Sequence, residues 1–421
     1  MRVRIEGSVT RFHGRVTVLV LVTGLAVIAV LPVVALGAGS SLVPSPNSAI
    51  PRSSSSKGAT PQTYLLDVSC TAAKACTAVG DYVNSGGDYV SLAEVWNGTS
   101  WAIQTTPNPT GAKDTFLSGV ACPSATACTA VGEYVNSAGH YETLAEVWNG
   151  TSWAIQTTPN PTGVKGAFLF GVSCKSAAAC TAVGDYENKG GSYAPLAEAW
   201  DGTSWAIQAT ANPAGAESTY LSDVSCTSAD ACVAIGDYEE SGGEYMTLAE
   251  VWNGTIWAIQ TTPNPTGAIG TSLSGVSCKS AAACTAVGDY ENSAGSFLTF
   301  AEVWNGTSWA LQSAPSPTGA TGTFLSQVSC PSATACTAAG AYENSAGSYL
   351  TLAEVWNGTS WAIQATPNPT GVKGTFLSGV SCKSAAACTA VGDDENSVGS
   401  YAPLAEAWNG TSWAIETTPN P

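Results

Sequence analysis

A ten-residue segment that recurs at a fixed interval constrains the fold of this chain more than any other feature. Residues 92–101 are Leu-Ala-Glu-Val-Trp-Asn-Gly-Thr-Ser-Trp, and close copies follow every 52 residues without insertion or deletion. The later copies end at Trp153, Trp205, Trp257, Trp309, Trp361 and Trp413. A constant repeat of this length indicates one supersecondary unit copied seven times, each burying its apolar face only against a neighbour.

Each copy of the segment is predicted to be a β-hairpin. Asn97-Gly98 is typical of a two-residue type I′ turn, in which both residues have positive φ. Such a turn pairs Trp96 with Thr99, Val95 with Ser100 and Glu94 with Trp101. Alternation along the strands gives two unlike faces, so copies are expected to stack face to back. The bulky face carries Leu92, Glu94, Trp96, Thr99, Trp101 and Ile103, and the shallow face carries Ala93, Val95, Ser100 and Ala102.

Every copy contains four predicted strands separated by turn residues. In the last copy they cover residues 376–382, 388–393, 401–408 and 411–417. Four short strands in a repeat of about 40–50 residues are typical of a propeller blade. The predicted fold class is therefore all-β: a seven-bladed β-propeller of four-stranded blades, preceded by a signal or anchor helix. A linear β-solenoid is the alternative, and seven alike copies without capping repeats favour the closed ring.

The chain divides into three predicted parts. Residues 1–38 form a signal peptide or membrane anchor, because arginines precede a long uncharged run and Ala35-Leu36-Gly37 offers a cleavage site. If it is not cleaved, the same run is long enough to span a bilayer. Residues 39–62 are a Ser/Pro-rich linker, and residues 63–421 are the propeller, with repeats ending at 109, 161, 213, 265, 317, 369 and 421. Either fate of the signal places the propeller outside the cytoplasm, secreted or anchored.

All 14 cysteines follow the repeat, two in each copy. An even count, regular spacing and an oxidising destination predict seven disulfides within the copies. The expected pairs are Cys70–Cys76, Cys122–Cys128, Cys174–Cys180, Cys226–Cys232, Cys278–Cys284, Cys330–Cys336 and Cys382–Cys388. The spacing between the paired cysteines and the lack of a histidine partner argue against zinc.

Charge and composition restrict the partners. Only 11% of the residues are charged, the formal net charge is −17, and Arg52 is the only arginine beyond the signal. So acidic a chain is not expected to bind nucleic acid, whose phosphates require basic contacts. The partners expected for an exported propeller are an extracellular glycan, a cell-wall polymer or a protein. No cofactor is expected, and the chain is expected to be a monomer.

Two short motifs carry a family resemblance in every copy. They are Ala78-Val79-Gly80 on the second strand and Asn97-Gly98-Thr99-Ser100-Trp101 between the third and fourth strands. The repeat resembles those of secreted bacterial propellers related to the Asp-box and photosystem-assembly-factor types, which implies a fold rather than an activity. The Asp-box aspartate is present only as Asp201, and the spacing is shorter. Some Asp-box relatives are sialidases, which hold the carboxylate of their substrate with three arginines. The predicted propeller contains no arginine, so sialidase activity is excluded.

The hairpin supplies the first candidate site. Trp96, Trp101 and their equivalents could stack on sugars as in a multivalent lectin, but a chain poor in long aliphatic side chains is expected to use them as interblade core. Glu94 recurs in all seven copies, whereas a reaction centre requires one or two of the repeated residues to differ from the rest. The equivalents of Glu94 are Glu146, Glu198, Glu250, Glu302, Glu354 and Glu406. Glu94 is therefore expected to accept hydrogen bonds from an indole or backbone N–H. Glu94, Trp96, Asn97, Gly98 and Trp101 are predicted to be structural.

Acidic loops are the remaining candidates. The richest loop offers Asp237, Glu239, Glu240 and Glu244 as calcium ligands, although its spacing is not that of an EF-hand and a solvated hairpin loop is the favoured interpretation. No nucleophile–base pair is present, and His140 is the only histidine beyond the signal. The sequence therefore predicts an exported binding or surface-scaffold propeller that is not an enzyme. The alternatives are a multivalent carbohydrate-binding, lectin-like propeller and a polysaccharide-acting enzyme with carboxylates in the central channel or on the top face.

Overall fold

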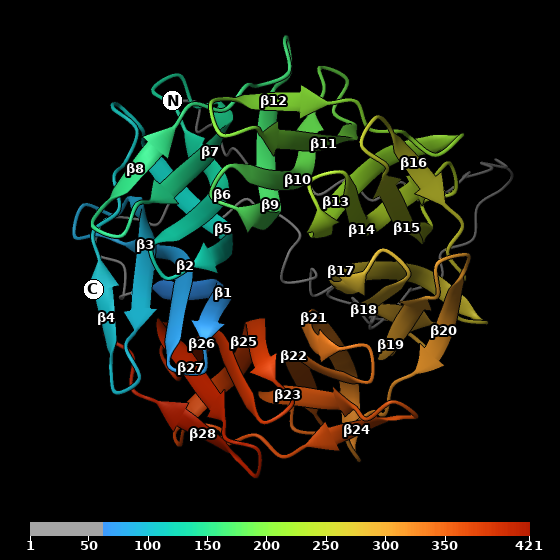
Figure 1. Cartoon of the computed structure of the whole chain (residues 1–421). Helices are drawn as coiled ribbons and strands as arrows, with labels where there is room; N and C mark the ends of the chain where they lie inside the picture. The colour runs from blue at the N-terminus through green and yellow to red at the C-terminus, as the bar shows by residue number, and fades with distance from the viewer. Residues whose placement is uncertain (1–61) are drawn as a thin grey trace, which may run out of the picture. The chain divides into compact units, whose positions relative to one another are not determined.

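The computed structural model describes residues 62–421, and the predicted signal and most of the predicted linker lie outside this range. The described residues form strands β1 to β28 and no helix, which confirms the all-β prediction. None of them belongs to a helix able to cross a membrane. The strands make seven four-stranded blades that follow one another around a ring (Figure 1).

Each blade takes four consecutive strands, with the following bounds. Blade 1 contains β1 (Thr63–Ala72), β2 (Ala75–Val83), β3 (Tyr89–Trp96) and β4 (Trp101–Gln104), and blade 2 contains β5 (Asp114–Ser124), β6 (Ala127–Val135), β7 (Tyr141–Trp148) and β8 (Trp153–Gln156). Blade 3 contains β9 (Gly166–Ser176), β10 (Ala179–Glu187), β11 (Tyr193–Trp200) and β12 (Trp205–Gln208), and blade 4 contains β13 (Ala216–Ser228), β14 (Ala231–Glu240), β15 (Tyr245–Trp252) and β16 (Trp257–Gln260). Blade 5 contains β17 (Ala268–Ser280), β18 (Ala283–Asn292), β19 (Phe297–Trp304) and β20 (Trp309–Ser313), and blade 6 contains β21 (Ala320–Ser332), β22 (Ala335–Asn344), β23 (Tyr349–Trp356) and β24 (Trp361–Gln364). Blade 7 contains β25 (Val372–Ser384), β26 (Ala387–Asn396), β27 (Tyr401–Trp408) and β28 (Trp413–Glu416), so its first two strands are longer than predicted and its last is shorter.

Within each blade the strands pair antiparallel in the order of the sequence. All seven predicted disulfides are formed. Each joins the end of the innermost strand to the start of the second, as at Cys70 and Cys76, which are cross-strand partners. The innermost strand of blade 1 also has a bulge between Leu65 and Asp67. A covalent link and a bulge therefore fix the register of the strands nearest the ring axis.

The turn of the hairpin is not the predicted one. Strand pairing sets Trp96 opposite Trp101 and Glu94 opposite Ile103, so residues 97–100 form a four-residue loop. Gly98 has a φ of 95°, but in the described range only glycines have positive φ, so Asn97 does not. A type I′ turn needs positive φ at both central residues and is therefore excluded. The Asn97 side chain causes the difference, because its Oδ1 accepts the N–H groups of the third and fourth loop residues and closes the loop from within. The predicted pairs of Trp96, Val95 and Glu94 were therefore wrong, although both tryptophans do share the bulky face.

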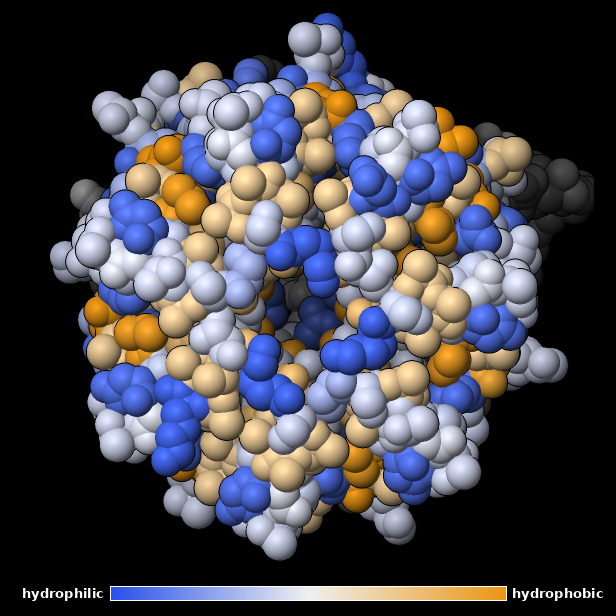
Figure 2. All heavy atoms as spheres, viewed as in Figure 1, coloured by the Kyte–Doolittle hydropathy of each residue, from blue (hydrophilic) through white to orange (hydrophobic). Residues whose placement is uncertain are grey.

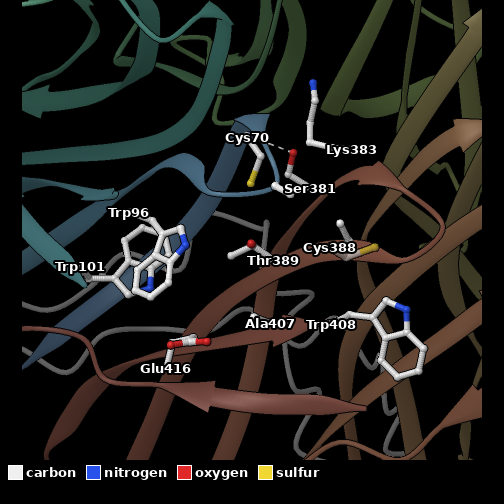
Figure 3. Close-up of a pocket in the computed structure, with 12 residues that line it drawn as sticks. Cys70, Trp96, Trp101, Ser381, Lys383, Cys388, Thr389, Ala407, Trp408 and Glu416 are labelled. Carbon is white, nitrogen blue, oxygen red and sulfur yellow. Dashed lines mark hydrogen bonds between the residues drawn. The ribbon is translucent and has the colours of Figure 1, made fainter. Parts of the chain in front are cut away.

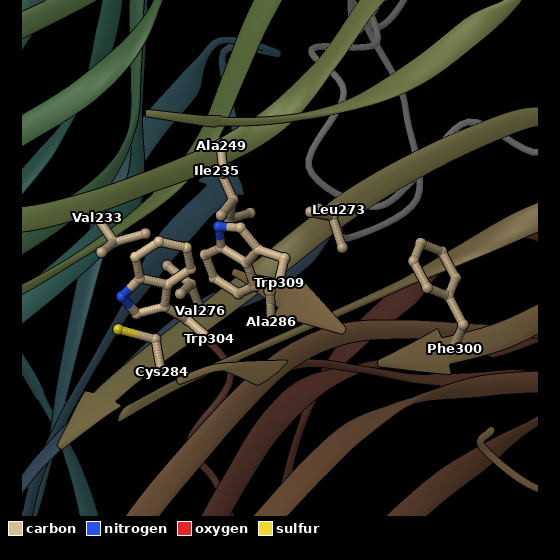
Figure 4. Close-up of a cluster of buried hydrophobic side chains, with 10 residues drawn as sticks. All are labelled: Val233, Ile235, Ala249, Leu273, Val276, Cys284, Ala286, Phe300, Trp304 and Trp309. Carbon is tan, nitrogen blue, oxygen red and sulfur yellow. The ribbon is translucent and has the colours of Figure 1, made fainter. Parts of the chain in front are cut away.

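The bulky face of each blade packs against the shallow face of the preceding blade, which is the predicted face-to-back stacking. In blade 1, Leu92 and Trp101 cluster with Val391 and Ala405 of blade 7. Figure 4 shows the equivalent layer of blade 5, where the two tryptophans pack beside Ile235 and Ala249 of blade 4. The small residues of the shallow face allow this close approach. The core is thus divided into interblade layers rather than gathered at one centre.

Ring closure repeats the contacts that join successive blades. Gln62 pairs in parallel with Tyr401 of blade 7, in the positions that Gly166 and Tyr141 occupy between blades 3 and 2. Thr63 Oγ1 donates to Asn420 Oδ1 over 2.7 Å, as Thr115 does to Asn108 where the chain is continuous. In the described range no strand is exchanged between the first and last blades, and β1 lies directly beside β25 and β26 (Figure 1). Complete blades therefore close the ring through lateral contacts.

Candidate functional site

Two tryptophans stack at the outer part of every blade. Their ring centroids lie 5.7–5.9 Å apart and their planes are tilted by 38–44°. Trp101 and its equivalents, which begin the outermost strand, are only 4–6% exposed. Trp96 and its equivalents are partly buried, except Trp304, which is 8% exposed. One tryptophan of each pair therefore belongs to the predicted core, and the other borders solvent in every blade except blade 5.

Hydrogen bonds hold both kinds of indole in place. Trp153 Nε1 donates to Gln104 Oε1 of the preceding blade over 2.8 Å, and Trp205, Trp257, Trp361 and Trp413 make the same bond. The outer tryptophans Trp200, Trp304 and Trp408 instead donate to a carbonyl between the cysteines of their own blade, over 3.1–3.2 Å. A fixed indole is a rigid platform that loses little entropy when a ligand stacks on it.

The groove between blades 7 and 1 lies between tryptophans of both blades. Figure 3 shows Trp96 and Trp101 together at one end and Trp408 at the other, with Thr389 and Ala407 between them. The polar lining comes from Ser381, Lys383 and Glu416 of blade 7. Ser381 Oγ accepts the backbone N–H of Cys70 over 3.0 Å, which fixes the wall of one blade to the other.

A groove of the same composition lies between blades 3 and 4. Trp200, Thr181, Ser173 and Lys175 line it at the positions that Trp408, Thr389, Ser381 and Lys383 occupy between blades 7 and 1. Asp201 supplies its carboxylate. Trp200 also borders a third groove, toward Gln156 and Thr158 of blade 2. One outer tryptophan therefore serves the grooves on both sides of its blade.

The repeated glutamate accepts no indole N–H in the described range, and five of the seven buried indoles bond to glutamine instead. Glu94 and its six equivalents are 0% exposed. Glu146 accepts the Ser91 hydroxyl of blade 1 over 3.4 Å, and Glu250 accepts the backbone N–H of Ala211 over 3.3 Å. Burial raises the pKa of Glu94 to about 8 and that of Glu250 to about 7. Of the two expected partners, the indole N–H was wrong and the backbone N–H is found at Glu250. The raised pKa favours a neutral carboxyl at acidic pH.

Carboxylates that do break the repeat lie on the innermost strands, where the sequence did not point to them. The position of Asp67 is glycine in four blades, aspartate again at Asp223 and glutamine at Gln327. Asp67 accepts the N–H of Val68 and, from the next blade, that of Val120, both over 2.8 Å. Asp223 accepts N–H groups in the same way, and Gln327 bonds to it. A column-by-column comparison of the repeats reveals this set, whereas a search for motifs does not.

The Asp67 and Asp223 carboxylates join neighbouring blades through hydrogen bonds, and burial changes their pKa values. Burial is the main cause that raises the pKa of Asp67 to about 7, and the Asp223 carboxylate adds to it. The pKa of Asp223 rises only to about 6, because backbone N–H groups and Gln327 stabilise its charge. On the face seen in Figure 2, polar side chains gather around the central hollow and apolar patches lie toward the perimeter. The oxygens of both aspartates are occupied by N–H groups, an arrangement suited to joining blades.

The predicted calcium loop is mostly strand. Asp237, Glu239 and Glu240 belong to β14, and only Glu244 lies in the turn that follows. Burial and the nearby Asp289 carboxylate of the next blade raise the pKa of Asp237 to about 8. The carboxylate that acts on Glu239 is a different one, Glu217. Among residues 62–421 no group of three or more histidines, cysteines or acids is placed to hold a metal ion. The solvated-loop interpretation holds for residues 241–244 alone.

Comparison with known proteins identifies the fold. No protein-family model and no curated protein sequence matches the chain. The β-propeller domain of the trilobed protease from Pyrococcus furiosus, described as having an open Velcro topology, aligns at a TM-score of 0.50 with 10% identity, over 85% of this chain and 98% of that one. The fucose-specific lectin of Aleuria aurantia aligns at 0.42 with 12% identity (74% and 97%), and Trypanosoma rangeli sialidase at 0.43 with 9% (73% and 56%). The first of these supports the propeller fold that the strand pairing shows.

Proposed function

We propose that the protein is an exported, non-catalytic propeller that binds saccharides in the grooves between its blades. The observation that carries the proposal is the tryptophan pair of the blade, of which one ring is buried and the other, at Trp96, Trp200 and Trp408, borders a groove. A sugar ring offers an apolar face that packs on an indole, and hydroxyls that bond to the groove walls. Seven disulfides support an oxidising, extracytoplasmic location.

The walls of the groove between blades 3 and 4 fit this ligand class. Lys175 donates hydrogen bonds and Asp201 accepts them, so both can bind neighbouring hydroxyls, and bonds to charged groups are the stronger kind. Ser173 and Thr181 add neutral hydroxyls. Mixed charge favours a neutral sugar over a strongly anionic polymer. The grooves are shallow and repeated, so binding is expected to be weak at each groove and to gain strength on a polymer that spans several of them.

The proposal that the protein is not an enzyme rests on the carboxylates. Asp67 and Asp223 are two acids on the innermost strands that depart from the repeat, and the oxygens of each accept backbone N–H groups. A general acid or base needs an oxygen within reach of the substrate. The Asp67→Asn variant is therefore expected to leave every interaction with polysaccharide unchanged, and release of reducing ends that Asp67→Asn abolishes would reverse this part of the proposal.

The deciding experiment is a binding screen of the full chain against neutral, amino and acidic polysaccharides, followed by Trp200→Ala. We expect affinity for the bound polymer to fall several-fold in Trp200→Ala. The matched control is Ile207→Ser, because Ile207 lies on the outermost strand of the same blade and is 43% exposed. Circular dichroism and the thermal midpoint establish that both variants fold. Equal affinity in wild type and a folded Trp200→Ala would contradict the saccharide proposal.

A protein-binding scaffold is the second candidate, and a separate surface favours it. One aliphatic side chain on the outermost strand of each blade is 38–43% exposed: Ile103, Ile155, Ile207, Ile259, Leu311, Ile363 and Ile415. These seven residues offer a protein partner the same apolar contact on every blade. The same pair of variants separates the two functions, because a protein partner should be lost with Ile207→Ser and retained with Trp200→Ala.

A further inference from the structure

The loop that joins the last two strands of a blade contains an asparagine that is followed by glycine and whose side-chain oxygen accepts several hydrogen bonds. In blade 5, Asn305 Oδ1 accepts three hydrogen bonds, from Thr307 N over 2.9 Å, Thr307 Oγ1 over 2.7 Å and Ser308 N over 3.0 Å. The next residue, Gly306, has a φ of 95° and no side chain to shield its backbone nitrogen. Asn97, Asn149, Asn357 and Asn409 make the same three bonds in their own blades.

Three donors that converge on one carbonyl oxygen stabilise negative charge on that oxygen. This is the arrangement by which enzymes favour the tetrahedral intermediate of acyl transfer. The amide of Asn305 forms such an intermediate when the backbone nitrogen of Gly306 attacks Cγ. The loop therefore presents the electrophile, its oxyanion donors and the glycine nitrogen that acts as nucleophile in one exposed segment.

We propose that these Asn-Gly loops are sites of spontaneous deamidation, promoted by the folded loop. The Gly306 nitrogen forms a bond to Cγ and loses its proton, the bond from Cγ to the side-chain nitrogen breaks, and ammonia leaves with that proton. The resulting succinimide is opened by water, which gives aspartate or isoaspartate. No oxidant or other reactant is required, and each conversion adds one negative charge to the rim of the ring.

Blade 3 shows that the loop accepts the product. Asp201 stands where the other six blades have asparagine, and its Oδ1 accepts the same three bonds over 2.6–2.9 Å. The Thr203 hydroxyl, followed by the N–H groups of Ser204 and Thr203, lowers the pKa of Asp201. The ionised product is therefore held at least as well as the amide.

Blade 4 supplies a natural control. Its loop has Ile256 in place of serine, and Asn253 Oδ1 accepts only the N–H groups of Thr255 and Ile256, over 3.0 and 3.1 Å, within the described residues. The side chain of Asp230 lies against Gly254, where it opposes further negative charge. Asn253 should therefore convert more slowly than Asn305. A second control is Asn292, whose Oδ1 accepts two N–H groups but which precedes serine rather than glycine.

The test is a time course of the full, disulfide-intact chain at pH 8, in which peptide mapping by mass spectrometry measures aspartate plus isoaspartate at each site. The reference is the same chain reduced and unfolded in urea. We expect Asn305 to convert roughly threefold or more faster in the folded chain, well below the factor of 10²–10³ that an enclosed oxyanion donor supplies. Asn253 should be slower than Asn305, and Asn292 should stay unchanged. Folded rates at Asn305 at or below the unfolded rate would overturn the proposal.

Two variants test the role of the hydroxyl itself. Thr307→Val removes one donor to Oδ1, and the rate at Asn305 should fall toward that of Asn253, while Thr307→Ser keeps the hydroxyl and the rate. The rates at Asn97 and Asn409 in the same molecules serve as internal standards and show that the ring is intact. A faster conversion in Thr307→Val would mean that the hydrogen bonds protect the amide, which also overturns the proposal.

Discussion

The junction between blades 7 and 1 and the junction between blades 1 and 2 are built from the same positions, yet several of these positions carry different residues. Between blades 1 and 2, Glu146 accepts the Ser91 hydroxyl and Trp153 donates to Gln104. Between blades 7 and 1, the residue equivalent to Ser91 is Pro403 and the residue equivalent to Gln104 is Glu416. Both carboxyl oxygens of Glu94 and the N–H of Trp101 have no hydrogen-bond partner in the described range, and the same holds for Glu302 and Trp309 between blades 4 and 5.

The comparison shows which contacts hold a ring together when the chain does not cross the junction. Two contacts near the axis are kept, since Gln62 and Thr63 reproduce bonds that occur between linked blades, whereas the bond from Val120 to Asp67 has no counterpart because blade 7 has Gly379. The contacts farther out are reduced. In addition, no short linker lowers the entropic cost of bringing blades 7 and 1 together. The junction between blades 7 and 1 is therefore expected to open first under denaturant or heat.

The largest expected effect comes from the buried tryptophans. Trp153→Ala and Trp101→Ala should each destabilise the ring by about 3–5 kcal/mol, because each leaves a large cavity between blades. Trp153→Ala should cost about 1 kcal/mol more, since it also breaks a hydrogen bond and leaves Gln104 without its donor. Urea titration followed by circular dichroism measures both values. Equal values would show that the bond to Gln104 adds nothing to stability.

The next effect depends on pH. Burial raises the pKa of Glu94 to about 8, from 4.5 in an exposed chain. The folded protein thus binds this proton more tightly than the unfolded chain, so the stability it contributes is fully present below about pH 4.5 and is lost as the pH rises through 8. Glu94→Gln removes the titration, and at pH 9 it should stabilise the ring by roughly 1–3 kcal/mol, the penalty of an unsatisfied buried group. At pH 5 the variant should match the wild type.

The matched control for Glu94 is Glu146, which has the Ser91 hydroxyl as a partner. Glu146→Gln should gain less at pH 9 than Glu94→Gln, because the hydroxyl already stabilises the charge. Thermal midpoints of both variants from pH 5 to 9 test this. An equal gain in the two variants would mean that Pro403 does not weaken the junction.

How much of this could be predicted from the sequence depends on whether a feature is local to the repeat. The fold, the disulfides and the shared face of Trp96 and Trp101 follow from spacing and alternation, and all three are confirmed. The register of the hairpin could not be predicted, because Asn-Gly fits both a two-residue turn and a four-residue loop closed by the Asn97 side chain. The partners of Glu94 and the role of Asp67 depend on distances between blades, which no pattern within one repeat encodes.

A smaller effect tests the contacts that the two junctions share. Thr63→Val removes the bond to Asn420, and Thr115→Val removes the equivalent bond to Asn108. Each should cost about 1 kcal/mol, the usual net value of a hydrogen bond. Thr115→Val should cost more than Thr63→Val in urea titration, because Thr115 Oγ1 also accepts the backbone N–H of Ser91 over 3.1 Å and Pro403 offers no such donor to Thr63. A much larger loss in Thr63→Val would show that the open junction depends on this bond more than a linked junction does.

The smallest effect repairs the junction. Glu416→Gln introduces the glutamine that the other six blades have, which in five of them accepts the indole N–H of the next blade, and Trp101 Nε1 should then donate to Oε1 as Trp153 does to Gln104. We expect a gain of about 0.5–1.5 kcal/mol, because the bond replaces an unpaired buried N–H. The control is Gln104→Glu, which copies the natural difference into the junction between blades 1 and 2 and should lose a similar amount. The two changes should also move Trp101 and Trp153 fluorescence in opposite directions. A ring that is no more stable in Glu416→Gln would show that closure is limited by the axial contacts of Gln62 and Thr63, and that the outer part of the interface adjusts to them.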